Sequence, residues 1–479
     1  MALTQYRIGA FSGIHQGWSE NTLDNGMSPD ACNMDTTNGE LSVAKGYVHH
    51  LSCPLPTPAD VKRLFVWNRA AGRRFVAAVG NTLYAMKGDD EGWSAIYTYE
   101  NADAQGVQYD FLVLKIASDE VLLIANGCAQ MVKWDGDPSH AATLFGSADQ
   151  SSHRHVNYVE LYFNRLFAAG DKDNPSRLYW SMAPGGTRTL EDWGPAEESE
   201  NVSGGHVEVG SDSDPITGLF ALSNQLLIFK RDSVYRLLGD RPGNFRITPL
   251  NAVMRQPVHT SVIRYGDVLF FLTDGGMYYF DGQTVRRQGD ADKVKRFLER
   301  VDVTGCMSAA SRDKLYFAVK ENPASPGLDA VLVYDLARGA YMIRRGFGLT
   351  DMTAAGGVLY IADEQGYVCR FNEGEDYAGT PIEAYWETPL TDLGEKISNK
   401  QLKELYLRGT GGRLGVEAKT SGGNSYYERL MPAGEAGVLE APLTGSGRAF
   451  CLRFTNIHGS RFTIPGGVEV LLDVQRRTL

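Results

Sequence analysis

The side chains best suited to acid–base chemistry in this 479-residue chain are His153 and His155, two positions apart in SSHRHVNY. Histidine titrates near neutral pH and is the commonest general acid or base. A catalytic histidine also needs a partner, and no serine, cysteine or carboxylate partner is identifiable by spacing. The GGHVEVG run at 204–210 contains glycines but no following lysine or helix, so we do not interpret it as a phosphate-binding loop.

Oxygen and sulfur ligands are present, but not in metal-binding patterns. Asp135 with Asp137, and Asp171 with Asp173 and Asn174, could begin calcium loops, yet neither run reaches a terminal glutamate at the required spacing. We interpret both as turns. The six cysteines are scattered, without a Cys-x-x-Cys pair or clustered histidines. The sequence therefore predicts no metal, no cofactor and no disulfide framework, and the cysteines are interpreted as buried thiols.

The chain is organised instead around Leu226–Leu238, LLIFKRDSVYRLL, in which two apolar runs flank a short polar turn. This pattern predicts a β-hairpin of two strands. With this hairpin the pattern occurs seven times, and most second strands carry a tyrosine or another large residue. The other six copies pair Phe75–Val79 with Leu83–Met86, Val121–Ala125 with Met131–Trp134, Arg165–Ala168 with Leu178–Ser181, Val268–Leu272 with Met277–Phe280, Leu315–Val319 with Val331–Leu336, and Val358–Ala362 with Tyr367–Phe371.

The copies follow one another at intervals of roughly 35 to 55 residues, which is the period of β-propeller blades. A hairpin cannot bury both of its faces alone, and a closed ring of four-stranded sheets satisfies every copy. We predict an all-β fold with a propeller of about seven blades. The alternative is a β-sandwich or a stack of unrelated hairpins.

The chain divides into three parts. Residues 1–56 are rich in turn formers and form an arm, which we expect to pack on the C-terminal domain or on a neighbouring subunit. Residues 57–378 form the propeller, interrupted by an acidic, glycine-rich insertion at about 183–215 that is too long for an ordinary blade connection. Residues 379–479 contain longer alternating runs, typical of an antiparallel β-sandwich or barrel-like platform domain.

One helix is predicted, at Asp290–Val301. Four apolar residues recur there at i, i+3, i+4 and i+7, and Asp290 or Asp292 could cap the first turn. We interpret this segment as a helix packed on the outside of the ring.

The composition is that of an ordinary soluble protein, with 43% hydrophobic and 22% charged residues. A net charge of −11 argues against a protein that grips nucleic acid through phosphate contacts. The N-terminal MALTQYRIGAFSG lacks the apolar core of a signal peptide, and no window approaches the length of a membrane span. We expect a cytosolic origin and no membrane insertion.

Several stretches resemble the bacteriophage tail nozzle family, the tail tubular B or stabilisation proteins of short-tailed phages. The resemblance is carried by YFNRLFAAGDKDNPSRLYWS (162–181), EDW (191–193) and LLIFKRDSVYRLLG (226–239). The turn and strand at Asn33 to Gly46, WETPLTDLG (386–394) followed by Lys400, and FCLRFTNIHGSRFTIPGGVEVLLDV (450–474) agree with it. The resemblance covers most of the chain but includes no catalytic motif, so we predict that the protein is not an enzyme.

The resemblance implies a structural virion protein, assembled in the host cytoplasm and located in the virion tail. In such a tail, six copies form a ring that extends the DNA ejection channel below the portal and adaptor. The implied partners are other copies of the chain, the adaptor protein and a distal needle, fibre or receptor-binding protein. Genomic DNA would pass through the ring without specific binding.

Two other functions are consistent with a propeller. One is a monomeric carbohydrate- or protein-binding module, for which an exposed aromatic cluster would be evidence. The other is a propeller glycosidase, which needs two or three carboxylates converging at the ring axis. Thr273–Gly276 with Phe280 is similar to the aspartate box of sialidase blades, but it occurs once and lacks the tryptophan.

The long insertion supplies candidate channel-lining residues, because an acidic lumen repels DNA and lets it slide. The candidates are Glu197, Glu198, Glu200, Asp212 and Asp214, with Asp89, Asp90 and Glu91 behind them. Only groups within about 8 Å of the duplex would act at physiological salt.

Overall fold

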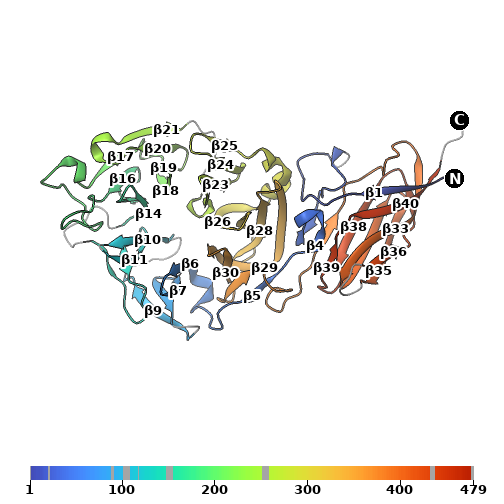
Figure 1. The fold of residues 1–479 in the computed structure, drawn as a ribbon, viewed down its shortest axis with the longest axis horizontal. Coiled ribbons are helices and arrows are strands. Elements are labelled where there is room, and N and C mark those ends of the chain that lie inside the picture. Colours follow the sequence, from blue (N-terminus) through green and yellow to red (C-terminus); the bar gives the residue numbers. More distant parts are fainter. Residues whose placement is uncertain are drawn as a thin grey trace.

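The computed structural model describes residues 2–19, 22–87, 91–100, 108–116, 118–146, 155–250, 258–431 and 437–475. Figure 1 shows a ring of small β-sheets beside a second β-unit that carries both ends of the chain. Within these ranges, no helix has the length and apolar character needed to cross a bilayer.

Five blades of the ring are four-stranded antiparallel sheets. Blade 1 contains β6 (Val61–Arg69), β7 (Gly72–Val79), β8 (Thr82–Met86) and β9 (Trp93–Thr98). Blade 2 contains β10 (Asp110–Ile116), β11 (Asp119–Ala125), β12 (Val132–Trp134) and β13 (Thr143–Leu144). Blade 3 contains β14 (Tyr158–Tyr162), β15 (Arg165–Ala169), β16 (Arg177–Trp180) and β17 (Gly205–Glu208). Blade 4 contains β18 (Ile216–Leu222), β19 (Gln225–Lys230), β20 (Val234–Leu238) and β21 (Arg246–Leu250), and blade 5 contains β22 (Ile263–Tyr265), β23 (Val268–Thr273), β24 (Gly276–Phe280) and β25 (Val285–Arg287).

Blades 6 and 7 share one long strand. The seven-stranded sheet runs in the order β26 (Asp302–Ser311), β27 (Lys314–Lys320), β28 (Leu328–Asp335), β29 (Ala340–Ala355), β30 (Val358–Asp363), β31 (Val368–Phe371) and β5 (Tyr47–His49). The first half of β29 pairs with β28, and after a register shift between Leu349 and Asp351 its second half pairs with β30. Strand β5 comes from the N-terminal arm and forms the outer edge of blade 7. The propeller therefore has seven blades, and the ring is closed by the start of the chain.

All seven predicted hairpins are confirmed as neighbouring strands of single sheets, namely β7–β8, β11–β12, β15–β16, β19–β20, β23–β24, β27–β28 and β30–β31. Five separate apolar clusters fill the interfaces between neighbouring blades. They lie between blades 7 and 1, 1 and 2, 2 and 3, 3 and 4, and 4 and 5. This arrangement confirms the predicted all-β propeller.

Acidic side chains on the inner strands link neighbouring blades. Asp110 on β10 accepts the backbone N–H of Val159 on β14 at 2.9 Å, and Glu160 on β14 accepts that of Ala221 on β18 at 3.1 Å. Asp351 on β29 accepts the backbone N–H of Leu64 on β6 of blade 1. Because a buried carboxylate is stable only when hydrogen-bonded, these contacts hold the inner strands in a fixed relation.

Two features of the propeller differ from prediction. The helix predicted at Asp290–Val301 is a short 3₁₀ segment, Gly289–Val294, followed by one helical turn, α1, at Lys295–Leu298. The Phe297 N–H there binds the side-chain oxygen of Gln16 in the arm at 3.0 Å, so tertiary contacts replace helical hydrogen bonds. The segment 183–215 is also not wholly an insertion, because it contains β17, which pairs with β16. Strand β17 is short and polar, so no apolar pattern marks it.

The second unit is a β-sandwich, which confirms the first of the two forms predicted for the C-terminal domain, and we call it the platform. One sheet contains β1 (Ala2–Ile8), β40 (Val468–Gln475), β33 (Asn399–Gly411), β36 (Gly437–Ala441), β37 (Gly445–Gly447), β39 (Phe462–Ile464), β4 (Leu41–Val43) and β3 (Met34–Asp35). The other contains β2 (Ala31–Cys32), β32 (Tyr385–Glu387), β38 (Phe450–Asn456), β34 (Arg413–Thr420) and β35 (Gly423–Leu430). Alternate residues of β33, β34, β38 and β40 are buried, so the two sheets share one apolar interior.

The arm contributes strands to both units. Strands β1, β2 and β4 pair with β40, β32 and β39 of the platform, and β3 pairs with β4, as the antiparallel registers show. From the sequence we expected the arm to pack only on the platform or on another subunit. In the structure its strand β5 also pairs with β31 and completes blade 7 of the propeller. A chain beginning near residue 57 would lack an edge strand of the propeller as well as part of the platform. Figure 1 shows the arm passing between the two units.

At the centre of this passage lies Asn33, which is 2% exposed. Its side-chain NH₂ donates to the carbonyls of Arg345 on β29 at 2.9 Å and of Glu383, which leads into the platform, at 2.7 Å. Its side-chain oxygen accepts the Arg345 N–H at 2.9 Å and the Tyr377 hydroxyl at 3.0 Å. The amide group is thus saturated, and its partners come from the propeller, the platform lead-in and the segment between them.

The backbone of Asn33 is equally constrained. Its N–H donates to the Ile343 carbonyl at 2.9 Å, and its carbonyl accepts the N–H of Ala44 at 2.8 Å. Its φ of 54° lies in the left-handed region, where asparagine is better tolerated than most residues. Nearby, the Phe11 ring packs edge-on against the Trp386 ring, with 5.5 Å between the ring centroids. Both belong to an apolar cluster that extends from blades 5 to 7 into the platform.

We predict that Asn33→Ala lowers the free energy of unfolding by about 2–5 kcal/mol, because it leaves several buried donors and acceptors without partners. The matched control is Asn38→Ala, since Asn38 has φ of 62° but an exposed side chain. Denaturant unfolding followed by tryptophan fluorescence gives both values. Equal destabilisation by the two substitutions would contradict a joining role for the Asn33 amide.

Candidate functional site

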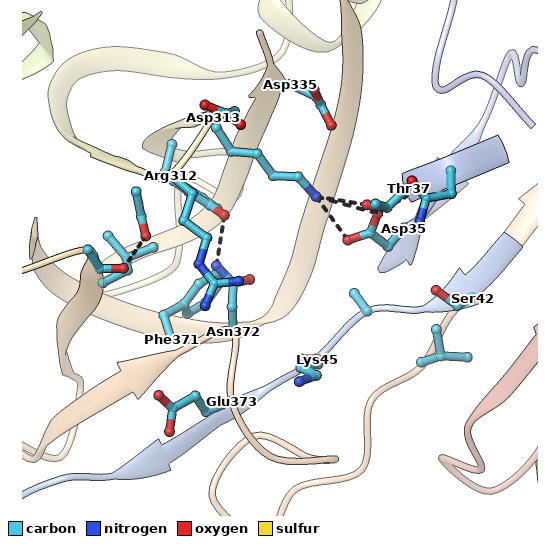
Figure 2. Close-up of a pocket in the computed structure, with 18 of the residues that line it drawn as sticks. Asp35, Thr37, Ser42, Lys45, Arg312, Asp313, Asp335, Phe371, Asn372 and Glu373 are labelled. Carbon is cyan, nitrogen blue, oxygen red and sulfur yellow. Dashed lines mark hydrogen bonds and ion pairs between the residues drawn. The ribbon is translucent and has the colours of Figure 1, made fainter. Parts of the chain in front are cut away.

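The larger of two notable cavities lies where the arm passes blades 6 and 7. This junction cleft has a volume of about 970 Å³ and is lined by residues of the arm, of both blades and by Arg461 of the platform. Figure 2 shows Asp35 and Thr37 on one side of the cleft, opposite Arg312, Phe371 and Asn372. Its walls therefore come from segments that are far apart in the sequence.

The charges that line the junction cleft balance. The basic residues are Lys45, Arg312, Lys314, Arg338 and Arg461, and the acidic ones are Asp35, Glu40, Asp313, Asp335 and Glu373. Five of each sign leave no net charge, so the cleft does not have the electrostatics of a phosphate or nucleic-acid groove.

The most strongly held group in the junction cleft is Asp35 of β3. Its carboxylate lies 3.1 Å from the Lys314 ammonium and 3.6 Å from the buried Arg344 guanidinium, and it accepts the Thr37 N–H at 2.9 Å. Burial alone would raise the pKa of Asp35, but the Arg344 and Lys314 charges and the Thr37 hydrogen bonds outweigh it and hold the pKa well below its usual range. The Asp35 carboxylate therefore ties the arm to blade 6 through ion pairs with Lys314 and Arg344.

Other polar groups of the junction cleft are also used within the protein. The Asn372 side chain donates to the Tyr316 hydroxyl at 2.8 Å, and Arg461 donates to the Val43 carbonyl at 2.8 Å. Arg344 donates to the Met34 carbonyl at 2.6 Å. These contacts hold arm, propeller and platform together, and the Thr37 hydroxyl, which donates to the Asp35 carboxylate, belongs to the same network.

The second cavity is a groove of about 620 Å³ on the outer face of the platform. In strand register, Arg7 of β1 lies beside Glu469 of β40, followed by Tyr406 of β33 and Glu440 of β36. The groove therefore crosses one sheet from its β1 edge to its β36 edge. We call it the platform groove.

Two edge strands of that sheet, on opposite sides of β40 and β33, are open in the described part of the chain, where β1 pairs only with β40 and β36 only with β33. Each edge carries an exposed apolar side chain, Leu3 at 68% and Val438 at 58%. An edge strand offers unpaired backbone N–H and C=O groups, and natural proteins usually cover or charge such edges. Two such edges on opposite sides of one sheet form a candidate assembly site.

The structure does not bring the five predicted channel carboxylates together. Glu197, Glu198 and Glu200 lie on the connection before β17, whereas Asp212 and Asp214 lie on the connection after it. The two groups are therefore at opposite ends of that strand.

The two groups also differ in their contacts. Glu197, Glu198 and Glu200 are exposed, and Glu198 forms an ion pair with Arg188. Asp212 accepts a hydrogen bond from the Ser176 hydroxyl. Asp214 accepts the backbone N–H of Asp232 at 2.7 Å and a hydroxyl of the same turn. Both aspartates therefore stabilise loops of blades 3 and 4.

The remaining candidates from the sequence are placed as follows. Glu91 and His155 are exposed, while Asp89, Asp90 and His153 lie outside the described residues. The runs that begin at Asp135 and Asp171 are turns, as interpreted, because each of these carboxylates accepts the N–H two residues later at 2.9 Å.

A propeller glycosidase would need carboxylates at the ring axis, and two acidic residues, Asp110 on β10 and Glu160 on β14, lie on the inner strands of neighbouring blades. Burial raises the pKa of Glu160 to about 7, although N–H groups of Ala221 and Leu161 act in the opposite direction. Both carboxylates accept backbone N–H groups of the next blade, and in that role they link blades.

No protein-family model matches this chain. No curated protein matches it either. Among solved structures it is similar to the computationally designed Ika8 protein, at 11% identity over 67% of this chain and 99% of that one, with a TM-score of 0.41. BamB from Moraxella catarrhalis matches at 12% identity over 78% of this chain and 98% of that one, with a TM-score of 0.39. The Pan2 WD40 domain of Neurospora crassa matches at 11% identity over 69% of this chain and 96% of that one, with a TM-score of 0.41. At these values the similarities say nothing about what the chain binds.

We predict that Asp35→Asn lowers the free energy of unfolding at neutral pH by about 1–3 kcal/mol, since Lys314 and Arg344 lose their shared anion. The folded pKa of Asp35 is below that of the unfolded chain, about 4. Its stabilisation is therefore complete above about pH 4 and declines as the pH falls further, so the difference between wild type and variant should narrow there.

The measurement is denaturant unfolding at a series of pH values. Asp313→Asn is the control, because Asp313 lines the same cleft but is exposed. If the difference in the free energy of unfolding between wild type and Asp35→Asn does not change with pH, the Asp35 charge is not what stabilises the junction.

Proposed function

We propose that this chain is a structural assembly subunit, the nozzle protein of a short-tailed bacteriophage tail. The observation that supports the proposal is the pair of open edges, β1 and β36, on opposite sides of one platform sheet. When the β1 edge of one copy meets the β36 edge of the next, the contact is head-to-tail. Such contacts close into a ring when the rotation between copies closes.

The two edges are chemically compatible. The β1 edge offers the exposed side chains of Leu3, Gln5 and Arg7, and the β36 edge offers those of Val438 and Glu440. Pairing would cover an apolar side chain on each strand and bring opposite charges near one another. The platform groove runs between these edges and would become part of the same contact surface.

In this proposal the ring contains six copies, joins the tail adaptor on one side and binds a needle, fibre or receptor-binding protein on the other. The DNA would pass through the ring on its way out of the virion. A net charge of −11 on each chain suits a wall that does not retain DNA. Glu197, Glu198 and Glu200 remain the proposed channel-lining group, because they are exposed and share one connection.

A second candidate is a monomeric protein- or carbohydrate-binding propeller. The observation that favours it is the junction cleft, which is a large polar cavity against the propeller. The exposed aromatic cluster typical of a sugar-binding site is not found among the described residues, where Trp18, Phe163 and Tyr426 lie on three separate segments. A protein ligand is the better occupant for this candidate.

We predict that Leu3→Lys and Val438→Lys each prevent ring formation, because each puts a charge on an edge that must be covered and desolvated. The control is Leu144→Lys, which changes an equally apolar, exposed residue on the outer strand of blade 2. Size-exclusion chromatography with light scattering measures the mass of each assembly.

Wild type and Leu144→Lys should have six times the chain mass, and the two edge variants should be smaller. Circular dichroism checks that all four proteins are folded. If wild type runs as a monomer at micromolar concentration, the ring proposal is wrong and the binding-module candidate is favoured. If the edge variants still form rings, assembly uses another surface.

A further inference from the structure

Three metal-ligating side chains meet where the arm closes the propeller. His49 is the last residue of β5, Cys369 lies on β31, and Asp363 is the last residue of β30. Their ligand atoms all lie within 4.8 Å of one another. The residues are more than three hundred positions apart at the extremes, so no sequence spacing marks them.

Strand pairing places two of the three side chains on one face. Cys369 and His49 are directly opposite partners in the antiparallel β31–β5 pair, and such partners project from the same side of a sheet. Asp363 begins the turn that leads from β30 to β31, and its Oδ1 accepts the N–H groups of Gln365 at 3.0 Å and Tyr367 at 2.8 Å. This turn fixes the carboxylate and directs its other oxygen toward Cys369 and His49.

That second oxygen, Asp363 Oδ2, lies 3.7 Å from the Cys369 Sγ and 3.8 Å from the His49 Nε2. In a tetrahedral zinc site, the bond lengths of about 2.0–2.3 Å place ligand atoms about 3.3–3.6 Å apart. The Asp363 oxygen is therefore within a few tenths of an ångström of the tetrahedral spacing from each of the other two ligand atoms, and the His49 and Cys369 atoms lie within 4.8 Å of each other. The His49 ring stacks on Tyr367 with centroids 4.2 Å apart, and because its side chain is 39% exposed, a small rotation would bring its ring nitrogen closer to Cys369.

Two of the three side chains are buried. Cys369 is fully buried, and the Asp363 side chain is 6% exposed. Among the described residues, the hydrogen bond that reaches Asp363 Oδ2 comes from the Cys369 thiol, which is a weak donor. A buried carboxylate oxygen is poorly satisfied by such a donor, and a cation would satisfy it fully.

We propose that His49, Asp363 and Cys369 bind a divalent transition metal of zinc type and so fasten β5 to blade 7. One thiolate, one imidazole and one carboxylate suit zinc, whereas magnesium and calcium prefer oxygen ligands alone. The Cys369 S–H proton leaves to solvent when the metal binds. A water molecule takes the fourth position on the exposed His49 side.

The metal would act as a clip at the point where the propeller is closed by a three-residue strand. Strand β5 is the outer edge of blade 7, and blade 7 contacts blade 1 through their shared apolar cluster. A metal ion that binds the folded state and not the unfolded state would raise the stability of this closure. The proposal is independent of ring assembly, because it concerns contacts within one chain.

The test is a Co²⁺ titration of the full-length chain after treatment with a chelator under reducing conditions. Co²⁺ takes the place of zinc and produces a near-ultraviolet thiolate charge-transfer band when cysteine is a ligand. We expect one Co²⁺ per chain, displacement of the band by Zn²⁺, and a rise in melting temperature with Zn²⁺.

Cys369→Ser and His49→Gln should each abolish the tight-binding band and the rise in melting temperature. His49→Gln changes a partly exposed side chain, so it keeps the test valid if Cys369→Ser folds poorly. Cys128→Ser is the control, because it removes a partly buried thiol on another blade and should leave the band intact. The proposal is overturned if wild type shows no band, or if the band survives His49→Gln.

Discussion

The buried amide of Asn33 is the contact on which the arrangement of the two β-units depends. A chain that passes through a buried junction must find partners for every backbone N–H and C=O group, because unpaired ones are costly. The Asn33 side chain is such a partner, because its NH₂ group donates to a carbonyl of β29 on one side and to the Glu383 carbonyl on the other. Asn456 holds the same lead-in segment from the platform side, donating to the Ile382 carbonyl and accepting the Ala384 N–H, both at 2.7 Å. The lead-in to the platform is thus held between two asparagines.

This constraint explains why the start of the chain matters in both units. The arm must lie between propeller and platform for Asn33 to reach its partners, and from there β5 extends into blade 7 while β1 extends to the far side of the platform. Asp35 adds an ionic contact to blade 6 along the same path. Propeller and platform are consequently joined through the arm.

The propeller could be predicted from the sequence because its evidence is local. Each hairpin is an apolar run, a turn and a second run within some twenty-five residues, and all seven were recognisable by period-two patterning. A short strand at Tyr47–Val48 is visible in the sequence, but the partners of the arm strands β2 and β5 could not be predicted, because these strands are two and three residues long and pair with segments more than three hundred positions away. Strand β17 was missed because it is polar and exposed on its alternate residues.

The candidate sites were less predictable for the same reason. Asp35 and Lys314 are 279 positions apart, and nothing in either neighbourhood marks the pair. The acidic segment before β17 was visible from composition, but its separation from Asp212 and Asp214 depends on the strand between them. The open edges β1 and β36 could be recognised only after the sheet order was known.

Electron microscopy of the purified chain is the most direct test of ring assembly, since it shows the assembly itself. We expect closed rings of six two-lobed subunits with a central channel, in which the platforms of neighbouring subunits touch. Isolated two-lobed particles at all concentrations, or dimers related by a twofold axis, would contradict it.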